Sequence, residues 1–179
     1  MNLRRTALLA LGTLTLAIPI LASCGGSSDG EGGEAPLVAF QDPAAKLMVS
    51  YPGTWQKTSD QPLTFTGVDE YISIEMRPLS GDVLSAAKVD EAALSTANPG
   101  FKRSGVIGAS KEVKNSVVIS YEWDLAKSAA TGKPVHERAD RYYIDLGNGR
   151  MAILTGTSPK ASFDREQVRD IALTLKVTR

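Results

Sequence analysis

After about residue 36, apolar and polar residues alternate along much of the chain, and this period of two predicts β-strands with one face on a core. The clearest example is 117–125, where apolar residues alternate with polar ones that include Glu122 and Asp124. Pro52 and Gly53, which follow another such segment, are expected to occupy the central positions of a type II turn. The other predicted strands of this kind are 47–51, 63–66, 71–77 and 105–109.

Two longer strand-like segments, 135–146 and 150–157, are joined by the sequence Gly-Asn-Gly at 147–149. An Asn-Gly pair between apolar runs is the strongest short-range signal for a β-hairpin. Together with 117–125, these segments are predicted to form an antiparallel meander. The glycine spacing also matches the start of a dinucleotide-binding fingerprint, but that fingerprint requires a strand followed by a helix, so a turn is the favoured interpretation.

Two further segments have the pattern of helices. Residues 82–97 are rich in alanine and are followed by Asn-Pro-Gly at 98–100, which ends a helix. Near the C-terminus, Asp164 is the expected N-cap of a second helix with apolar residues at positions i, i+3, i+4 and i+7. Its buried stripe is expected to be Val168, Ile171, Ala172 and Leu175. An antiparallel β-sheet flanked by helices places the chain in the α+β class.

The first 24 residues have a different pattern. Arg4 and Arg5 precede an apolar run over 7–22, which is the order of a secretory signal and is too short for a membrane-spanning helix. The sequence Leu-Ala-Ser-Cys at 21–24 resembles the lipobox of bacterial lipoproteins, in which the cysteine thiol is alkylated with a diacylglyceryl group and the chain is cut just before it. We therefore predict that 1–23 is a signal peptide and that Cys24 is a lipid anchor.

The residues after Cys24 support this interpretation. The segment 25–34 consists of glycine, serine and acidic residues, so it cannot pack around a buried core cysteine, which is the alternative role for a lone thiol. We read 24–35 as the lipidated cysteine and a flexible tether with a reach of roughly 15 to 20 Å. Residues 36–179 are sufficient for one globular domain.

Composition limits the classes of partner. Removing Arg4 and Arg5 with the signal peptide leaves 18 of the 20 basic residues against 20 acidic ones. A nearly neutral protein has no electrostatic reason to bind nucleic acid or anionic lipid headgroups. Because Cys24 is the only cysteine, an intramolecular disulfide is impossible, and the core alone must hold the exported domain together.

Catalytic or metal-binding residues are sparse. His136 is the only histidine, there is no G-x-S-x-G motif for a nucleophile, and a zinc site would need further histidine or cysteine ligands. Glu122 and Asp124 share one face of a strand with Cα atoms about 6.5 to 7 Å apart. That spacing is compatible with paired carboxylates of a glycosidase or with part of a calcium site. Arg138 and Arg141 across the hairpin offer a simpler explanation, which is cross-strand ion pairing.

A loop at 128–134 precedes the hairpin. Within it, Thr131, Gly132 and Lys133 offer an ammonium group and backbone N–H groups to an anion. We expect no catalytic residue, no resident cofactor and no metal site beyond the weak candidates Glu122 and Asp124. The predicted partner surface consists of Thr131, Gly132, Lys133, His136, Arg138 and Arg141.

The sequence YPGTW at 51–55, just after a predicted strand, resembles a corner motif of the PsbP-like family, which belongs to the wider Mog1/PsbP-like fold. The resemblance continues in the same order through residues 121–123, 141–144, 147–149 and 152–155 to the final helix, and it covers roughly 37–178. It implies an antiparallel sheet with helices on both faces, an α/β/α sandwich. Aromatic residues at 51, 55, 121 and 123 are most simply core or corner residues, with a groove as the alternative.

The resemblance also implies a class of function. Members of the family include an extrinsic subunit of the oxygen-evolving photosystem, thylakoid assembly factors and bacterial lipoproteins, and calcium binding has been associated with the family. This chain lacks a counterpart of a basic N-terminal docking segment, since 25–34 is acidic or neutral. The resemblance therefore implies a non-enzymatic accessory protein, and the missing docking segment points away from a photosystem role and toward docking on a partner in general.

From the sequence we expect an exported protein, anchored by lipid to the extracytoplasmic side of the cell membrane. There it would dock on, or help to assemble, a membrane-associated protein partner. The alternatives are a carrier of a small apolar ligand or lipid, with a pocket between sheet and helix, a hydrolase that uses Glu122 and Asp124, and a calcium-binding protein. The sequence leaves the oligomeric state open.

Overall fold

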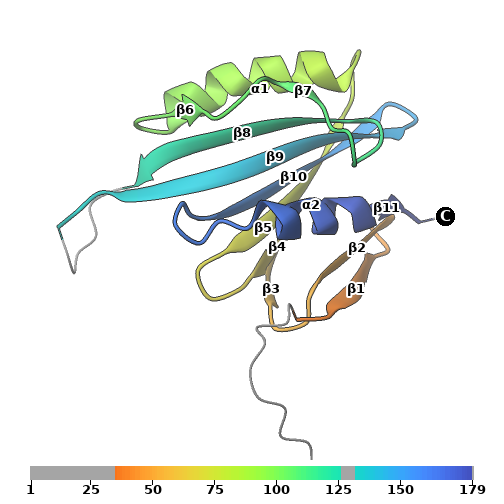
Figure 1. Ribbon diagram of the computed structural model, residues 1–179. Coiled ribbons are helices and arrows are strands. Elements are labelled where there is room, and N and C mark those ends of the chain that lie inside the picture. The colour runs from red at the N-terminus through yellow and green to blue at the C-terminus, as the bar shows by residue number, and fades with distance from the viewer. Residues whose placement is uncertain (1–34, 126–131, 179) are drawn as a thin grey trace, which may run out of the picture. The chain divides into compact units, whose positions relative to one another are not determined.

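The structure is a computed structural model that describes residues 35–125 and 132–178 (Figure 1). The predicted signal peptide, Cys24 and all but the last residue of the predicted tether lie outside these ranges, as does Thr131. In chain order, the elements are β1 (Leu37–Asp42), β2 (Leu47–Pro52), β3 (Gln56–Asp60), β4 (Leu63–Thr66), β5 (Tyr71–Pro78), α1 (Val83–Ala97), β6 (Lys102–Arg103), β7 (Gly108–Ala109), β8 (Ser116–Leu125), β9 (Val135–Gly147), β10 (Arg150–Pro159), α2 (Arg165–Thr174) and β11 (Lys176–Val177).

The strands form two antiparallel sheets. The larger sheet has eight strands in the order β3-β4-β5-β10-β9-β8-β6, with β7 also paired to β8, and the smaller sheet has the order β1-β2-β11. The predicted meander β8-β9-β10 is confirmed. Its hairpin turn places Asn148 at φ 55° and Gly149 at φ 67°, which asparagine and glycine adopt more readily than other residues.

The two faces of the larger sheet carry separate apolar cores, and the two helices lie on opposite faces (Figure 1). On the α1 face, the predicted inward residues of β8 are buried from Val117 to Trp123, while Leu125 is exposed. On the α2 face, the core includes Phe65 and Ile72 of the larger sheet, and all four residues of the predicted α2 stripe are buried.

The smaller sheet shares the α2 face, because Leu47 and Val49 of β2 join the same core. The predicted antiparallel sheet flanked by helices is therefore present, and strands contain more than twice as many of the described residues as helices do. The term α/β/α sandwich fits only loosely, since one of the two outer layers is part helix and part sheet.

Local signals explain where elements begin and end. Asp82 caps α1 by accepting a hydrogen bond from the Ser85 N–H at 2.9 Å, and the Asp164 carboxylate caps α2 in the predicted manner. After β2, the Trp55 N–H donates to the Pro52 carbonyl at 2.9 Å. Pro52 therefore takes the first position of this turn, and the expected type II turn with Pro52 and Gly53 at its centre is wrong. Neither helix in the described part of the chain is long and apolar enough to cross a membrane.

The sequence pattern missed four strands and overestimated another. Of the predicted strand 105–109, only β7 forms. The missed β3 is an edge strand of polar residues without alternation, and β1 is exposed at most of its positions. The other missed strands, β6 and β11, have two residues each. Strands of this kind are held by backbone hydrogen bonds to a neighbouring strand. Because those bonds do not depend on the side chains, the sequence of such a strand need not alternate between apolar and polar residues.

Candidate functional site

The polar residues that the sequence singles out on β8 and β9 divide between the two faces of the larger sheet. The strand register places Glu122 opposite Arg138, but it places Arg141 opposite Ile119. Because side chains alternate along a strand, Arg138 and Arg141, three residues apart, lie on opposite faces. The expected pairing of Glu122 with Arg138 is confirmed, whereas the expectation that Arg141 also faces the carboxylates is wrong.

Glu122 lies between two cations on the α2 face. The Lys160 Nζ donates to one carboxylate oxygen at 2.7 Å, and the Arg138 Nη1 lies 3.9 Å from the other. The hydrogen bond from Lys160 is the main reason why the pKa of Glu122 is lowered. A glycosidase acid needs a raised pKa so that it stays protonated. Glu122 has the opposite environment, so the geometry does not favour the hydrolase alternative.

Asp124, the second predicted carboxylate, pairs with His136 instead. The Nδ1 of His136 lies 2.7 Å from the Asp124 Oδ1, and both side chains are about half exposed. The Asp124 carboxylate also lies against the backbone of Gly100, where a Cβ atom would come within 2.5 Å of Oδ2. Among the described residues, no group of three or more His, Cys, Asp or Glu side chains is placed to hold a metal ion. Glu122 and Asp124 therefore gain no third ligand of these residue types from this part of the chain.

The sequence did not single out Asp140, which lies two residues beyond Arg138 on the same face of β9. Its side chain is only 2 % exposed, and the Arg165 Nε from the first turn of α2 donates to its Oδ2 at 2.9 Å. A second nitrogen of Arg165 lies 3.3 Å from the Ser120 hydroxyl oxygen. The separation of two residues between Arg138 and Asp140 indicates that both lie on the same face of β9. The pairing of Asp140 with Arg165 has no such signal, because it depends on how α2 packs.

Two buried polar atoms lie on this face without a partner. Arg138 Nε and Asp140 Oδ1 make no hydrogen bond within the part of the chain that the structure describes. Buried polar atoms without a partner are uncommon, because each costs desolvation energy. The Arg138 guanidinium lies over the Phe163 ring at 5.3 Å from its centroid, which fixes the position of the charged group.

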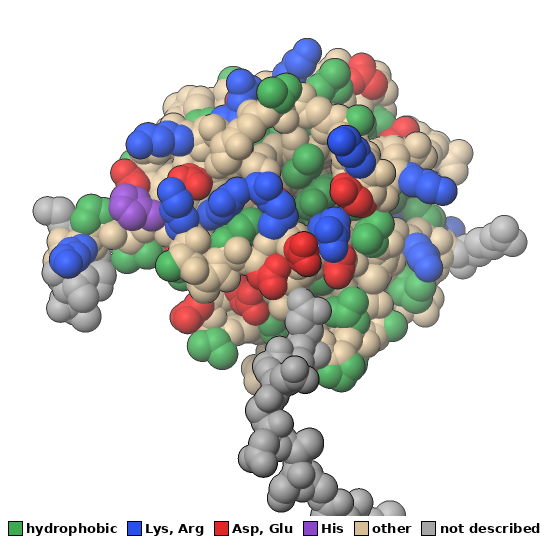
Figure 2. Space-filling view, viewed as in Figure 1, with side chains coloured by type: hydrophobic (Ala, Val, Ile, Leu, Met, Phe, Trp, Pro, Cys, Tyr) green, Lys and Arg blue, Asp and Glu red, His purple; other side chains and the backbone are tan. Residues whose placement is uncertain are grey.

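We call Lys160, Arg138 and Arg165 the cationic row. In the view of Figure 2, Lys and Arg side chains run across the middle of the molecule, with the single histidine at one end and Asp and Glu side chains directly below them. The side chains of the row are 53, 25 and 52 % exposed, whereas the carboxylates beneath, Glu122 and Asp140, are 22 and 2 % exposed. Lys160 and Arg165 thus lie nearer to solvent than the carboxylates that pair with them, whereas Arg138 and Glu122 are almost equally exposed.

A groove of about 340 Å³ adjoins the cationic row, between β8 and α2. Asp140 and Arg165 line one part of it, and Lys111 and Arg169 line another. The Tyr142 side chain also lines the groove, and burial raises the pKa of Tyr142 to about 12, so its hydroxyl stays protonated and can donate. The groove therefore continues the row as a polar surface.

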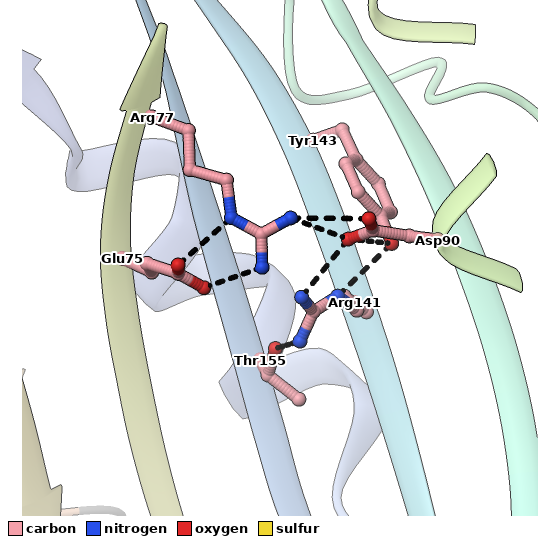
Figure 3. Close-up of polar contacts among 6 residues, drawn as sticks. All are labelled: Glu75, Arg77, Asp90, Arg141, Tyr143 and Thr155. Atoms are coloured by element: carbon pink, nitrogen blue, oxygen red, sulfur yellow. Dashed lines mark hydrogen bonds and ion pairs between the residues drawn. The ribbon is translucent and has the colours of Figure 1, made fainter. Parts of the chain in front are cut away.

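Arg141 belongs to a polar network on the opposite face, under α1 (Figure 3). Asp90 of α1 accepts from Arg77 at 3.0 and 3.1 Å, from Arg141 at 3.2 Å and from the Tyr143 hydroxyl at 3.2 Å. Arg141 also donates to the Thr155 hydroxyl at 2.9 Å and is 14 % exposed. The network links α1 to three strands of the larger sheet, and Arg141 does not share a surface with Arg138 and His136. Its members are Glu75, Arg77, Asp90, Arg141, Tyr143 and Thr155.

The predicted loop surface is described only in part. Gly132 has a φ of 65° and is exposed, as is Lys133. Thr131 lies outside the described residues. His136 and Arg138 follow this segment on β9 and reach the cationic row, so these residues of the predicted partner surface do come together.

A second depression of about 560 Å³ lies at the β1–β2 and β3–β4 turns. Buried Leu47, Leu63 and Ile74 line it together with Asp42 and Asp60. It lies between the smaller and the larger sheet. The carrier alternative predicts a pocket between a sheet and a helix, so this depression lies at a different place from the predicted one.

No family model matches the sequence, and no curated protein matches it. The chain is similar in structure to cyanobacterial PsbP (CyanoP) from Synechocystis sp. PCC 6803, with a TM-score of 0.52 and 14 % identity over 88 % of this chain and 98 % of that one. It is also similar to the Ran-binding protein Mog1p of Saccharomyces cerevisiae, with a TM-score of 0.53 and 8 % identity over 80 % of this chain and 96 % of that one. These structures confirm the predicted architecture: the chain has the PsbP/Mog1-like fold.

Proposed function

We propose that this protein is an exported, lipid-anchored accessory protein without enzymatic activity, which docks on another protein through the cationic row. The observation that carries the proposal is the arrangement of Lys160, Arg138 and Arg165. Each is held by an ion pair to a less exposed carboxylate, so charged groups with fixed positions face solvent together. Fixed polar groups recognise a partner with a smaller entropy cost than mobile ones.

The anchor in this proposal rests on the sequence. The basic start, the apolar run and the residues before Cys24 match a lipoprotein signal, and the glycine-rich residues after it provide a tether. Two or more acyl chains hold a protein stably at a membrane, whereas one holds it only marginally. The domain would thus be retained close to membrane proteins and be free to reorient.

The fold and the chemistry of the site support docking. Mog1p, which shares the fold, is a Ran-binding protein, so the fold is compatible with binding another protein. The carboxylates that a hydrolase would use, Glu122 and Asp124, are ion-paired to Lys160 and His136. Groups paired in this way position charges on a surface, which is what a docking site needs.

Two experiments test the proposal. In cells fed an alkyne fatty acid, the intact protein should become labelled and fractionate with membranes, and Cys24→Ala should abolish both. Chemical crosslinking in living cells, followed by mass spectrometry, should capture one membrane-associated protein with the intact form and little with Cys24→Ala. An unlabelled intact protein would contradict the anchor, and an absence of any enriched protein would contradict docking.

The depression lined by Leu47, Leu63 and Ile74 favours a second candidate function, that of a carrier for a small apolar ligand. Its volume of about 560 Å³ falls within the usual range for small-molecule sites, and buried apolar residues contribute to its lining. Native mass spectrometry of the protein purified from its own membranes tests this function. A bound small molecule that Leu63→Arg removes would support it, and a protein without bound mass would contradict it.

A further inference from the structure

The charges beneath and within the cationic row do not balance. Lys160 and Arg138 share Glu122, and Arg165 pairs with Asp140, so three cations face two carboxylates. Asp140 is almost completely buried, and its negative charge is covered by Arg165. The row itself therefore carries an excess of positive charge, and the half-exposed Asp124 near its end is paired with His136.

The ion pairs leave hydrogen-bond donors available. Arg165 uses Nε and Nη2 for Asp140 and Ser120, and no contact within the described residues uses its Nη1. Arg138 is stacked on Phe163, and its Nη1 lies 3.9 Å from Glu122, beyond hydrogen-bond distance. Guanidinium groups held in this way bind carboxylates well, because a planar fork of donors matches the two carboxylate oxygens.

Two positions of this site lie on one strand. Arg138 and Asp140, the carboxylate that pairs with Arg165, are two residues apart on β9, a separation of about 6.5 to 7 Å between Cα atoms. Acidic side chains of a peptide that lies across the row match its three cations in sign.

The two buried atoms without partners also lie at the base of the row. Arg138 Nε and Asp140 Oδ1 gain nothing for stability by remaining unpaired. Of the two atoms, only Arg138 Nε is a donor, so it alone suits a carboxylate of the partner. The groove beside them is lined by Lys111, Arg165 and Arg169 and equally by Glu112, Asp140 and Glu166, so the excess of positive charge is confined to the row.

From these observations, and resting on the docking function proposed above, we infer that the cationic row binds an acidic segment of the partner protein. The carboxylates pair with Arg138, Arg165 and Lys160. Binding should weaken as salt is added, because the contacts are ionic and partly exposed to solvent.

Fluorescence anisotropy tests this inference on the full chain in a nonionic detergent. The probe is a fluorescein-labelled nonapeptide in which glutamate alternates with serine, and the reference is the same peptide with glutamine. The glutamate peptide should bind at least tenfold more tightly than the glutamine peptide at low salt. Arg138→Gln with Lys160→Gln should weaken its binding at least tenfold.

The matched control carries the same change in net charge on exposed lysines elsewhere, Lys88→Gln with Lys176→Gln. Its affinity for the glutamate peptide should stay within twofold of the unmodified protein. Lys160→Gln alone, at a half-exposed side chain that tolerates change, should weaken binding about threefold. Equal loss in row and control variants, or equal binding of both peptides, would overturn the inference. So would binding of inorganic pyrophosphate at the row without binding of the glutamate peptide.

Failure of the acidic-segment inference can be distinguished from failure of the docking proposal. If crosslinking in cells still captures a partner but the glutamate peptide does not bind, the acidic segment is wrong and docking stands. If the peptide binds at the row but no partner is captured in cells, the row does recognise acidic segments, and docking as a cellular function is contradicted.

Discussion

The ion pair between Asp140 and Arg165 should make a measurable contribution to stability. Arg165→Met keeps most of the aliphatic stem but leaves the Asp140 carboxylate, which is 2 % exposed, without its donor. Removing one partner of a fully buried pair costs about 3–5 kcal/mol. Arg165 is 52 % exposed, so water can follow the deleted group and solvate part of the charge, and we expect a loss of about 2 kcal/mol in the free energy of unfolding.

Urea denaturation followed by tryptophan fluorescence measures this loss, since Trp55 and Trp123 are both buried. The midpoint should fall without a change in the slope of free energy against urea. Arg169→Met is the matched control, because this arginine lies on the same helix but pairs with the half-exposed Asp170, and it should cost less than about 0.5 kcal/mol.

Asp140→Asn removes the buried charge that pairs with Arg165. In the double variant with Arg165→Met, the cost should be smaller than the sum of the two single costs by about 1 kcal/mol, because the interaction can be lost only once. Additive single costs, or a cost for Arg165→Met no larger than that of Arg169→Met, would refute the view that Asp140 depends on Arg165.

Three further predictions follow from the contacts. In Gly156→Ala, the new Cβ would lie 2.4 Å from a methyl of Val168, so α2 must shift away from β10 and the free energy of unfolding should fall by about 1–3 kcal/mol; an unchanged urea midpoint would contradict this. Asp90→Leu should increase hydrogen exchange across α1 more than across α2, because it leaves the guanidinium groups under α1 without their shared carboxylate. The hydrogen bond from Lys160 lowers the pKa of Glu122 in the folded protein. The pair therefore stabilises the protein fully above the pKa of the unfolded carboxyl, and this stabilisation is lost as the pH falls through the lower pKa of the folded state. Lys160→Met should flatten the curve of unfolding free energy against pH over this range, and a curve identical to that of the unmodified protein would contradict the pairing.

Alternation of residue types was enough to predict the centre of the fold. It predicted the bounds of β4 and the buried side of β8, because a strand with one face on a core has an apolar residue at every second position. It failed for β3, whose residues are polar throughout and which is held at the sheet edge by its pairing with β4. The extent of β1 likewise depends on its neighbour β2, and its own sequence lacks a regular period.

The candidate site was predictable only where the strand register determined it. Hairpin register brings Glu122 opposite Arg138, and parity along the strand would have shown that Arg141 faces the other way. The partners supplied by other elements were not predictable, because Arg165 is 25 residues from Asp140 in sequence and Lys160 is 38 residues from Glu122. These residues come into contact only when α2 and the end of β10 pack beside β8 and β9.

The central claim, that the protein docks on a partner through the cationic row, is tested most directly by site-specific crosslinking in living cells. A photoactivatable amino acid would replace Lys160 in the row or, as the control, Lys88 on α1, each in an otherwise intact chain. The account predicts one membrane-associated protein crosslinked from position 160 and little or none of it from position 88. Crosslinks to that protein from position 88 but not from position 160, or equal yields from both, would contradict the claim.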